Sequence, residues 1–556
     1  MSRHPRGKSK KRLHPKVENF VEAAPSPASH ASLPEHRRSA DEPRETSILR
    51  IETLIWAGAL LVIYACVATW GQFDFSDLMG YYNMQADAFL AGHLYIARNP
   101  SEGYLMDMVP FEGRFYLQWG PFPAVLHMMA KLAGGKLTDR VACILAGWLT
   151  SLVFLKIVVV LRGRYFPALP KWLCCWFFFT FALATPTAIV ALRGTIYHES
   201  IAWAALLVLF AFWALLEYLD RQSAPWVFLA GAGAGLAILT RVSLGLYAAG
   251  LLAGVAVLQR HWGRRKKVAA MHLAALAAPA AAGVLLMMAY NQARFRSPWE
   301  YGLKYLPVAA ADKPAYALNR VPENFLHYVL APIHVTLDCP WFTHKGWQPL
   351  VKTERAEDMS SMFLASPFLL LGFLAWPLFR TRDGRIFPLK VFAAVAGLSA
   401  FAVFFSLLCF VGTSRRYMQD FVPMLMVLAL LGVAYSAKTG SDWRRWQAPA
   451  WGIFALSALL HVHLVFFQPE TWAPLDPNVS KAFVALGPLV RRVLPGHQLD
   501  SRLAIHHNDL GLLYMDQGRY AEAIPHFEQA NRYMPASVSI QHNLTYARRL
   551  QAASGR

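Results

Sequence analysis

The chain has 556 residues, of which 56% are hydrophobic and only 16% are charged, and its formal net charge is +20. An ordinary soluble domain is about 45–50% apolar, so this composition excludes a single water-soluble globule. The basic residues collect in short segments between apolar runs rather than in one stripe, which is the positive-inside pattern of a membrane protein and gives no reason to expect a nucleic-acid partner. The six cysteines lie almost all within apolar runs, which argues against a disulfide framework or a zinc cluster.

Residues 1–47 are basic at first and then rich in Pro, Ser and Glu, without apolar periodicity. This composition predicts a disordered cytoplasmic tail. The first apolar run extends from about Ile48 to Trp70 and lacks a small-residue cleavage site directly after it. It therefore predicts a membrane helix that stays in the protein rather than a signal peptide.

Apolar stretches of about 20 residues, each bounded by Arg or Lys, have the length that crosses a hydrocarbon core. The loop 71–115 is acidic and is expected outside, whereas four basic loops are expected in the cytoplasm. These basic loops carry Arg162, Arg164 and Lys171; Arg260, Arg264, Arg265, Lys266 and Lys267; Arg380, Arg382 and Arg385; and Lys438, Arg444 and Arg445. The sequence predicts an all-α polytopic bundle in the cytoplasmic membrane, with the membrane domain at 48–467 and outer loops at 71–138 and 291–358. The predicted spans are 48–70, 139–161, 172–193, 198–219, 226–240, 242–258, 269–290, 359–380, 388–410, 420–437 and 449–467.

The segment 116–133 is apolar but has Gly120, Pro121 and Pro123 at its head. Its aromatic residues suit the interface, so we predict a juxtamembrane helix on the outer surface. Proline is also tolerated in the first turn of a true span, and that alternative stays open at this point.

The C-terminal region changes to soluble character. Residues 468–499 are Pro-rich and predict a linker, and 500–556 predict a small helical module. The spacing of its small and large residues matches a tetratricopeptide repeat, with the first helix of another at 538–550. So few repeats favour docking on the membrane domain or on a protein partner, and the odd span count places the module in the periplasm. The packing positions of the pattern are Leu510, Gly511, Tyr514, Ala523, Phe527, Ala530 and Pro535.

Asp77 is the acidic residue of interest in the first outer loop. Apolar and aromatic residues recur at helical spacing after it, which places Asp77 at the start of a helix lying against the membrane. Such an aspartate is a helix cap, a catalytic base, or both, and the pattern alone favours the cap.

Several blocks share their order with a known family. Asp77 after the first helix, Tyr81–Tyr82, ADAFLAGHLY, GRFYLQWGPFPAVL, GLAILTRVS, YNQARFRSPWEYGLKY and GTSRRYMQDFVP stand between about Ile48 and Phe467. This series resembles the GT-C integral-membrane glycosyltransferases, which include the protein O-mannosyltransferases and the lipid A aminoarabinose transferase. At Gln118 and Trp119 the chain departs from those relatives, which tend to carry an additional charged residue there. Glu102 and Asp107, from the same loop, are the candidate substitutes.

The resemblance implies that Asp77 is the base and that a polyprenyl-phosphate-linked sugar is the donor, with inversion at the anomeric carbon. The leaving phosphate needs cations, and the candidates at outer helix ends are Arg241, Arg415 and Arg416. Candidate contacts to the sugar or acceptor are Tyr81, Tyr82, Gln118, His198 and Glu199.

Structural alternatives stand beside each of these residues. Arg241 is alternatively a snorkelling side chain, and Arg415 and Arg416 are alternatively partners of Asp420. His198 and Glu199 have a cap-and-anchor interpretation, and the aromatic residues of 291–358 either stack on a sugar or anchor the loop at the interface. The sequence contains no metal-ligand spacing, no P-loop and no GxGxxG after a strand, so neither a cofactor nor a divalent metal is expected, and a lipid-linked donor is favoured over a nucleotide sugar.

Two other functions compete with the transferase. One is a non-catalytic membrane scaffold for envelope assembly that acts through the C-terminal module. The other is a transporter, which should have polar residues at mid-membrane depth and paired interrupted helices, whereas the charges here gather at helix ends.

Overall fold

The computed structural model describes residues 42–97, 108–306, 314–335, 342–343, 361–467, 476–493 and 497–554. The chain divides into two compact units, Met1–Thr53 and Leu54–Arg556, and the site described below belongs to the second. Most of the predicted tail, residues 1–41, lies outside the described residues. Helix α1 (Glu42–Ala68) begins six residues before the expected start at Ile48, with proline in its first turn, where a missing N–H costs nothing.

Seven helices of the described chain are long and apolar enough to cross a membrane, and a bent pair adds an eighth. The shorter apolar helices include three at predicted spans and one in 116–133, which at 11 residues is about 16 Å long and too short to cross. The all-α multi-pass membrane fold is thus confirmed, while the count of eleven spans stays a prediction. The long helices are α1, α4 (Asp139–Arg164), α7 (Ile196–Arg221), α9 (Gly245–His261), α10 (Lys266–Phe295), α14 (Phe387–Cys409) and α16 (Gln447–Phe467); the bent pair is α5 (Lys171–Leu183) with α6 (Pro186–Leu192); the shorter segments are α3 (Phe122–Leu132), α8 (Ala224–Thr240), Pro367–Arg380 with α13 (Trp376–Arg380), and α15 (Val422–Lys438).

The break between α5 and α6 bends the chain by 54° within the predicted span 172–193. Pro186 begins α6, and the Thr185 side chain caps it by accepting the N–H of Thr187. The carbonyl of Ala184, freed by the break, accepts a hydrogen bond of 2.8 Å from the Ser366 hydroxyl. The break is therefore satisfied by side chains within the protein, as an interrupted membrane helix requires.

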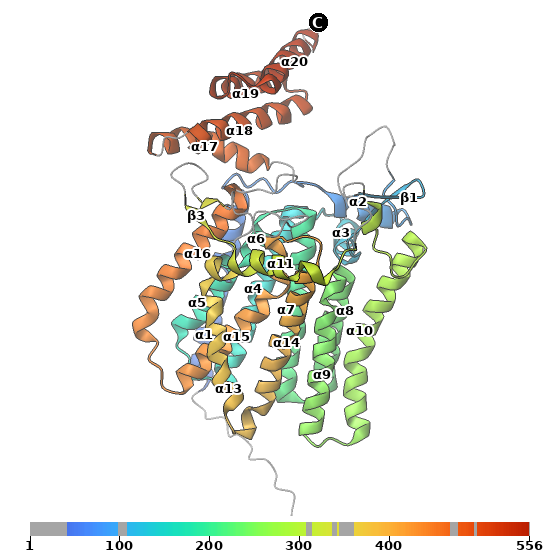
Figure 1. The fold of residues 1–556 in the computed structure, drawn as a ribbon, viewed down its shortest axis with the longest axis vertical. Helices are drawn as coiled ribbons and strands as arrows, with labels where there is room; N and C mark the ends of the chain where they lie inside the picture. Colours follow the sequence, from blue (N-terminus) through green and yellow to red (C-terminus); the bar gives the residue numbers. More distant parts are fainter. Residues whose placement is uncertain are drawn as a thin grey trace, which may run out of the picture. The chain divides into compact units, whose positions relative to one another are not determined.

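The basic turns lie at one end of the bundle. Arg164, at the end of α4, is 2.7 Å from Glu217 of α7, and Arg264 donates a hydrogen bond to Gln222 in the turn after α7. Figure 1 shows the α9–α10 and α13–α14 turns at this end, whereas α2 (Tyr81–Leu90), α3 and β1 lie at the opposite end. We call that opposite end the loop-rich end. Which end faces the cytoplasm stays a prediction.

The loop-rich end also contains β-structure that the all-α prediction omitted. Strands β1 (Met108–Phe111) and β2 (Arg114–Leu117) form an antiparallel hairpin. Its two turn residues, Glu112 and Gly113, both have positive φ, as a two-residue hairpin turn requires. A second pair, β3 (His334–Val335) and β4 (Phe342–Thr343), is shorter still. The other short elements are α11 (Val321–Phe325), α12 (Met362–Ala365), and the 3-10 or π turns Val242–Leu244, Leu303–Tyr305, Leu318–Arg320, Leu326–Leu330, Pro367–Ala375, Gly384–Ile386, Arg415–Asp420 and Arg444–Trp446.

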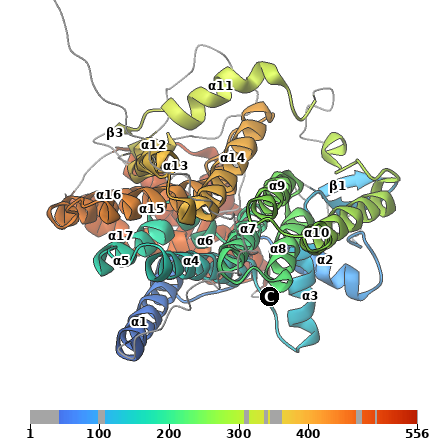
Figure 2. The ribbon, with the colours of Figure 1, turned by 90° about the horizontal axis from the view of Figure 1, so that it is seen from below.

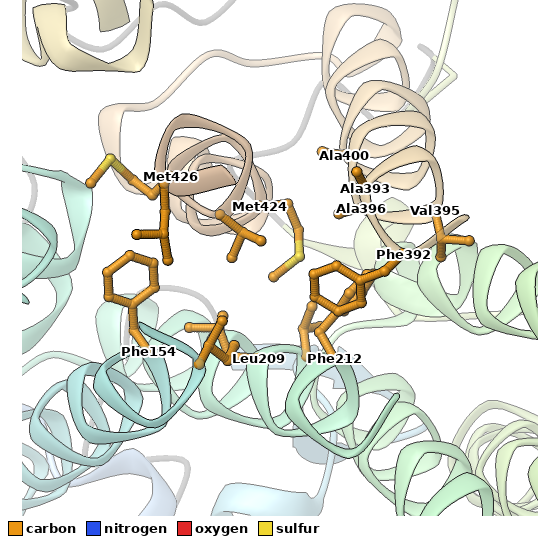
Figure 3. Packing of buried hydrophobic residues seen from close by; sticks show 14 of the residues in the cluster. Phe154, Leu209, Phe212, Phe392, Ala393, Val395, Ala396, Ala400, Met424 and Met426 are labelled. Carbon is orange, nitrogen blue, oxygen red and sulfur yellow. The ribbon is translucent and has the colours of Figure 1, made fainter. Parts of the chain in front are cut away.

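Helix α7 is the central element of the bundle. It packs against α4, α8, α14 and α15 (Figure 2), and 83% of its 18-residue apolar stretch is buried. Figure 3 shows Phe154 of α4, Leu209 and Phe212 of α7, Phe392 of α14 and Met424 of α15 facing one another across this core. The first residues of α7, Ile196 to Ser200, are buried as well.

Helices α8 and α10 touch through glycines. A Cβ at Gly231 would lie 2.2 Å from the carbonyl oxygen of Leu276, and one at Gly235 would lie 2.4 Å from that of Pro279. A Cβ at Gly283 would in turn lie 2.4 Å from the carbonyl oxygen of Gly235. Small residues permit such backbone contact between membrane helices, where dispersion contacts hold the pair together.

The C-terminal module consists of α17 (Pro477–Val493), α18 (His497–Asp516), α19 (Tyr520–Tyr533) and α20 (Val538–Ser554). Helix α17 occupies most of the predicted linker 468–499, which is a difference from the prediction. Its start is stabilised by Asp476, whose carboxylate accepts the N–H of Asn478 at 2.9 Å.

The predicted repeat positions lie between α18 and α19. Leu510, Ala523, Phe527 and Ala530 are buried, and a Cβ at Gly511 would lie 2.6 Å from the Phe527 ring. Tyr514 stacks on the ring of His526 with centroids 5.4 Å apart, and Pro535 follows the end of α19. The identification of this module as a tetratricopeptide repeat stays a prediction.

The glycine contact between α8 and α10 predicts a stability effect. Gly235→Ala should lower the free energy of unfolding by about 1–3 kcal/mol, because the added methyl group meets backbone that must move. The matched control is Gly452→Ala in α16, where a Cβ meets nothing within 4 Å. Thermal unfolding of both variants in detergent measures the difference, and equal midpoints would contradict the close contact.

Candidate functional site

Asp77 sits against the start of α4, not at the start of its own helix. Its Oδ1 accepts the N–H of Asp139 at 2.9 Å, its Oδ2 lies 2.7 Å from the Lys136 ammonium, and the Asn83 amide donates to it at 3.1 Å. The expectation that Asp77 begins the following helix is wrong, because α2 starts after Gly80, a residue with φ of 69°. Asp77 therefore places a carboxylate at the N-terminus of α4, where the helix dipole favours it.

Asp139 is a functional candidate that the sequence analysis missed. Its Oδ2 accepts the N–H groups of Met79 at 3.0 Å and Gly80 at 2.7 Å, while its Oδ1 is buried without a hydrogen bond. The two aspartates thus cap each other's chain segments. Beside them, the hydrogen bond and charge of Asp77 raise the pKa of Lys136. The missed signal was the Thr138–Asp139 pair directly ahead of a long apolar run, which is a helix-start pattern.

Glu199 forms a buried pair with His127, another residue that the sequence analysis missed. The His127 Nε2 and Glu199 Oε1 atoms are 2.8 Å apart, and both side chains have no exposed surface. The Trp203 indole donates to the same oxygen at 3.3 Å, whereas His127 Nδ1 and Glu199 Oε2 have no hydrogen bond. Burial lowers the pKa of His127, but the hydrogen bond to Glu199 and the charges of Asp139 and Asp77 more than offset this and raise it.

Three further candidates from the sequence, His198, Tyr81 and Gln118, lie at or near the ends of helices and strands. His198 Nδ1 is 2.7 Å from the hydroxyl of Thr195, the residue that precedes α7. Tyr81 is buried at the start of α2, and Gln118 is half-buried between β2 and α3. The geometry of His198 fits the cap interpretation, and the predicted contacts of these three residues with a substrate stay predictions.

Arg241 pairs with Asp420 between two distant parts of the chain. The Arg241 Nη2 is 2.7 Å from Asp420 Oδ2, and only 15% of the arginine and 1% of the aspartate side chain is exposed. Tyr247 also donates to the Asp420 carbonyl at 2.8 Å. The alternatives that Arg241 snorkels to water and that Asp420 pairs with Arg415 or Arg416 are therefore wrong. The 3-10 turn Arg415–Asp420 directs Asp420 toward the α8–α9 connection instead.

Arg416 shares an aromatic neighbour with Arg241. The Arg416 guanidinium lies 5.1 Å from the centre of the Tyr197 ring and 5.2 Å from that of Tyr417, and Arg241 lies 5.4 Å from the same Tyr417 ring. Trp119 packs edge-on against Tyr197 with centroids 5.2 Å apart. Cation–π contacts hold both guanidiniums in one aromatic layer.

Arg415 faces a different part of the bundle. It lines a separate small cavity with Pro186 of α6, Met362 of α12 and His461 of α16. Because successive residues of a 3-10 turn point about a third of a turn apart, Arg415 and Arg416 cannot face the same way. The structure brings together Arg241 and Arg416, but it does not bring Arg415 to them.

Tyr82 lies beside the His127–Glu199 pair. Its ring centre is 6.0 Å from that of His127. Burial and the negative charge of Glu199 raise the pKa of Tyr82 well above its usual value. The next residue, Asn83, donates a hydrogen bond to Asp77. Among the described residues, the contacts of Asp77 itself do not reach the arginines.

Several other candidates add no geometry to the site. Glu102 and Asp107 lie outside the described residues, as do Trp341 and Trp347 of the aromatic loop 291–358. Trp299 of the same loop is 72% exposed. Within the described ranges, no three His, Cys, Asp or Glu side chains are placed to hold a metal ion.

The Arg241–Asp420 pair predicts a marked asymmetry between single and double variants. Asp420→Ala should destabilise the protein by about 3–5 kcal/mol, because it leaves a guanidinium largely buried without its partner. The double variant Arg241→Met with Asp420→Leu should recover most of that loss. Unfolding in detergent measures all three proteins, and an Asp420→Ala protein as stable as the parent would contradict the pairing.

Among known proteins, similarity to this chain was found only in solved structures. No protein-family model and no curated protein matches the chain. ArnT from Cupriavidus metallidurans, bound to undecaprenyl phosphate, is 17% identical over 89% of this chain and 76% of its own, with a TM-score of 0.40. The Archaeoglobus fulgidus oligosaccharyltransferase in its apo form is 13% identical over 81% of this chain and 59% of its own, with a TM-score of 0.43.

Proposed function

We propose that the chain is a GT-C-type glycosyltransferase that moves a sugar from a polyprenyl phosphate to an acceptor of the cell envelope. The observation that carries the proposal is the set of largely buried charged side chains in this part of the structure: the Asp77 and Asp139 carboxylates, the His127–Glu199 pair and the Arg241–Asp420 pair. Charged groups inside a membrane bundle are costly and mark functional sites. A transporter would instead hold its polar groups near mid-membrane depth.

The chemistry divides between the two groups. The Asp77 carboxylate accepts the proton of the acceptor hydroxyl or amine as that atom bonds to the sugar C1. The bond from C1 to the phosphate oxygen breaks, and its electron pair leaves with the lipid phosphate, so the anomeric centre is inverted. Arg241 and Arg416 stabilise the charge of the departing phosphate, because a guanidinium group can donate two parallel hydrogen bonds to two phosphate oxygens.

The membrane arrangement belongs to the same proposal. The basic turns face the cytoplasm, and the loop-rich end with the C-terminal module faces the periplasm, which follows the positive-inside tendency. A lipid-linked donor then reaches Asp77 and Arg416 from the outer leaflet. A protein partner on the predicted tetratricopeptide module would be met on the same side.

The role of Asp77 predicts the effect of one isosteric change. Asp77→Asn keeps an oxygen for the Asp139 N–H but removes the base, so transfer should fall by about 10²–10⁴-fold. The assay supplies undecaprenyl phosphate carrying hexoses or pentoses and measures release of undecaprenyl phosphate from membranes.

Asp87→Asn is the matched control for this assay. Asp87 lies on the adjoining helix α2, is 62% exposed, and pairs with Lys131 at 2.7 Å. It should retain nearly full transfer. Full activity of Asp77→Asn would remove this residue as the base, and a biological role that persists in the inactive protein would favour the scaffold acting through the C-terminal module.

The two adjacent arginines predict different effects on the donor. Arg416→Gln should raise the KM for the lipid-linked donor about tenfold or more, because a charge-assisted contact to phosphate is lost. Arg415→Gln should change that KM much less, because its guanidinium lines a separate cavity. Steady-state kinetics with varied donor distinguishes the two variants, and equal changes would contradict this division.

A further inference from the structure

The C-terminal module is joined to the membrane domain by a buried ion pair. Asp476, which precedes α17, binds the Arg140 guanidinium through both oxygens at 2.7 and 3.0 Å. The arginine side chain is 1% exposed and the aspartate 13%, and Arg140 also donates to the Ala68 carbonyl at 2.9 Å. A buried arginine of this kind depends on its partner, because an uncompensated charge is expensive.

A second set of contacts joins the module to the loop that carries Asp77. The Asn478 amide, from the first turn of α17, donates to the Asp74 carbonyl at 2.8 Å. Asn478 itself is 1% exposed, and Lys481 lies 3.9 Å from the Asp74 carboxylate. The first turn of α17 thus holds the chain three residues before Asp77.

The first set of contacts ends at Arg140 in the first turn of α4, and the second ends at Asp74 in the Asp77 loop. Arg140 follows Asp139, whose N–H binds Asp77 and whose carboxylate binds Met79 and Gly80. The module therefore contacts the Asp77 loop directly, through Asp74. It also contacts that loop indirectly, because Arg140 follows the Asp139 whose carboxylate binds the loop.

We infer that the start of α17 is a positioning clamp for the Asp77 loop, so that the C-terminal module sets the alignment of the proposed base. This inference rests on the proposed function. Asp476 and Asn478 are positioning residues, because they act through Arg140 and Asp74. A partner that binds the module and shifts α17 would then change the rate of transfer without touching the substrate.

The test uses the full chain in lipid nanodiscs and two measurements. Asp476→Asn keeps an acceptor for the Asn478 N–H but removes the charge that pairs with Arg140. Hydrogen exchange of the amides in 74–84 should become about tenfold faster or more, because the loop opens more easily. Transfer from undecaprenyl-phosphate sugars should show a kcat about tenfold lower or more, with the donor KM nearly unchanged, because misalignment affects the chemical step.

The control is Asp500→Asn, which removes a more exposed Arg–Asp ion pair inside the module. Asp500 lies 3.0 Å from Arg491, and both residues belong to the C-terminal module. It should leave exchange in 74–84 and kcat at the parent values. If Asp476→Asn fails to fold, Asn478→Ala provides a milder second variant that loses only the bond to Asp74.

The outcomes separate the clamp from the proposed reaction. Unchanged exchange in 74–84 for both Asp476→Asn and Asn478→Ala would overturn the clamp, and so would faster exchange with an unchanged kcat in a protein that Asp77→Asn inactivates. If Asp77→Asn keeps full activity, the proposed base is wrong, and the exchange measurement alone then upholds or overturns the clamp.

Discussion

The loop-rich end depends on how the first turn of α4 satisfies its polar groups. The first N–H groups of any helix lack hydrogen-bond partners within that helix. Here the Thr138 hydroxyl accepts the N–H of Val141, and the Asp77 carboxylate accepts the N–H of Asp139. The next side chain, Arg140, is buried and needs a carboxylate. One turn of helix thereby draws together the Asp77 loop and the start of α17.

The fold was predictable wherever apolar runs are long. Burial of about 20 apolar residues in lipid leaves the chain little choice but helix, and the predicted segments have helices at their places. The hairpin around Glu112 was missed because its strands have only four residues each. Helix α17 was missed because Pro477 and Pro488 suggested a linker, although the first is tolerated at a helix start and the second lies inside the helix.

The candidate site was predictable in its residue types but not in its pairings. Charged residues at the ends of apolar helices identified Arg241, Arg416 and Glu199 as candidates. Their partners could not be read from spacing, because Arg241 and Asp420 are 179 positions apart and His127 and Glu199 are 72 apart. The same limit explains why the sequence grouped Arg415 with Arg416. The two residues are neighbours in sequence, but on a tight turn their side chains face different parts of the bundle. The roles assigned to Asp77 and Arg416 stay predictions.

The glycine contact between α8 and α10 has a mechanical consequence. Because Gly235 and Gly283 bring backbone against backbone, sliding one helix along the other would drive a carbonyl oxygen into a neighbouring Cα. We therefore expect the two helices to move together. Arg241 directly follows the end of α8, so any motion that opens the bundle on this side would carry its guanidinium with the two helices and pull it against Asp420.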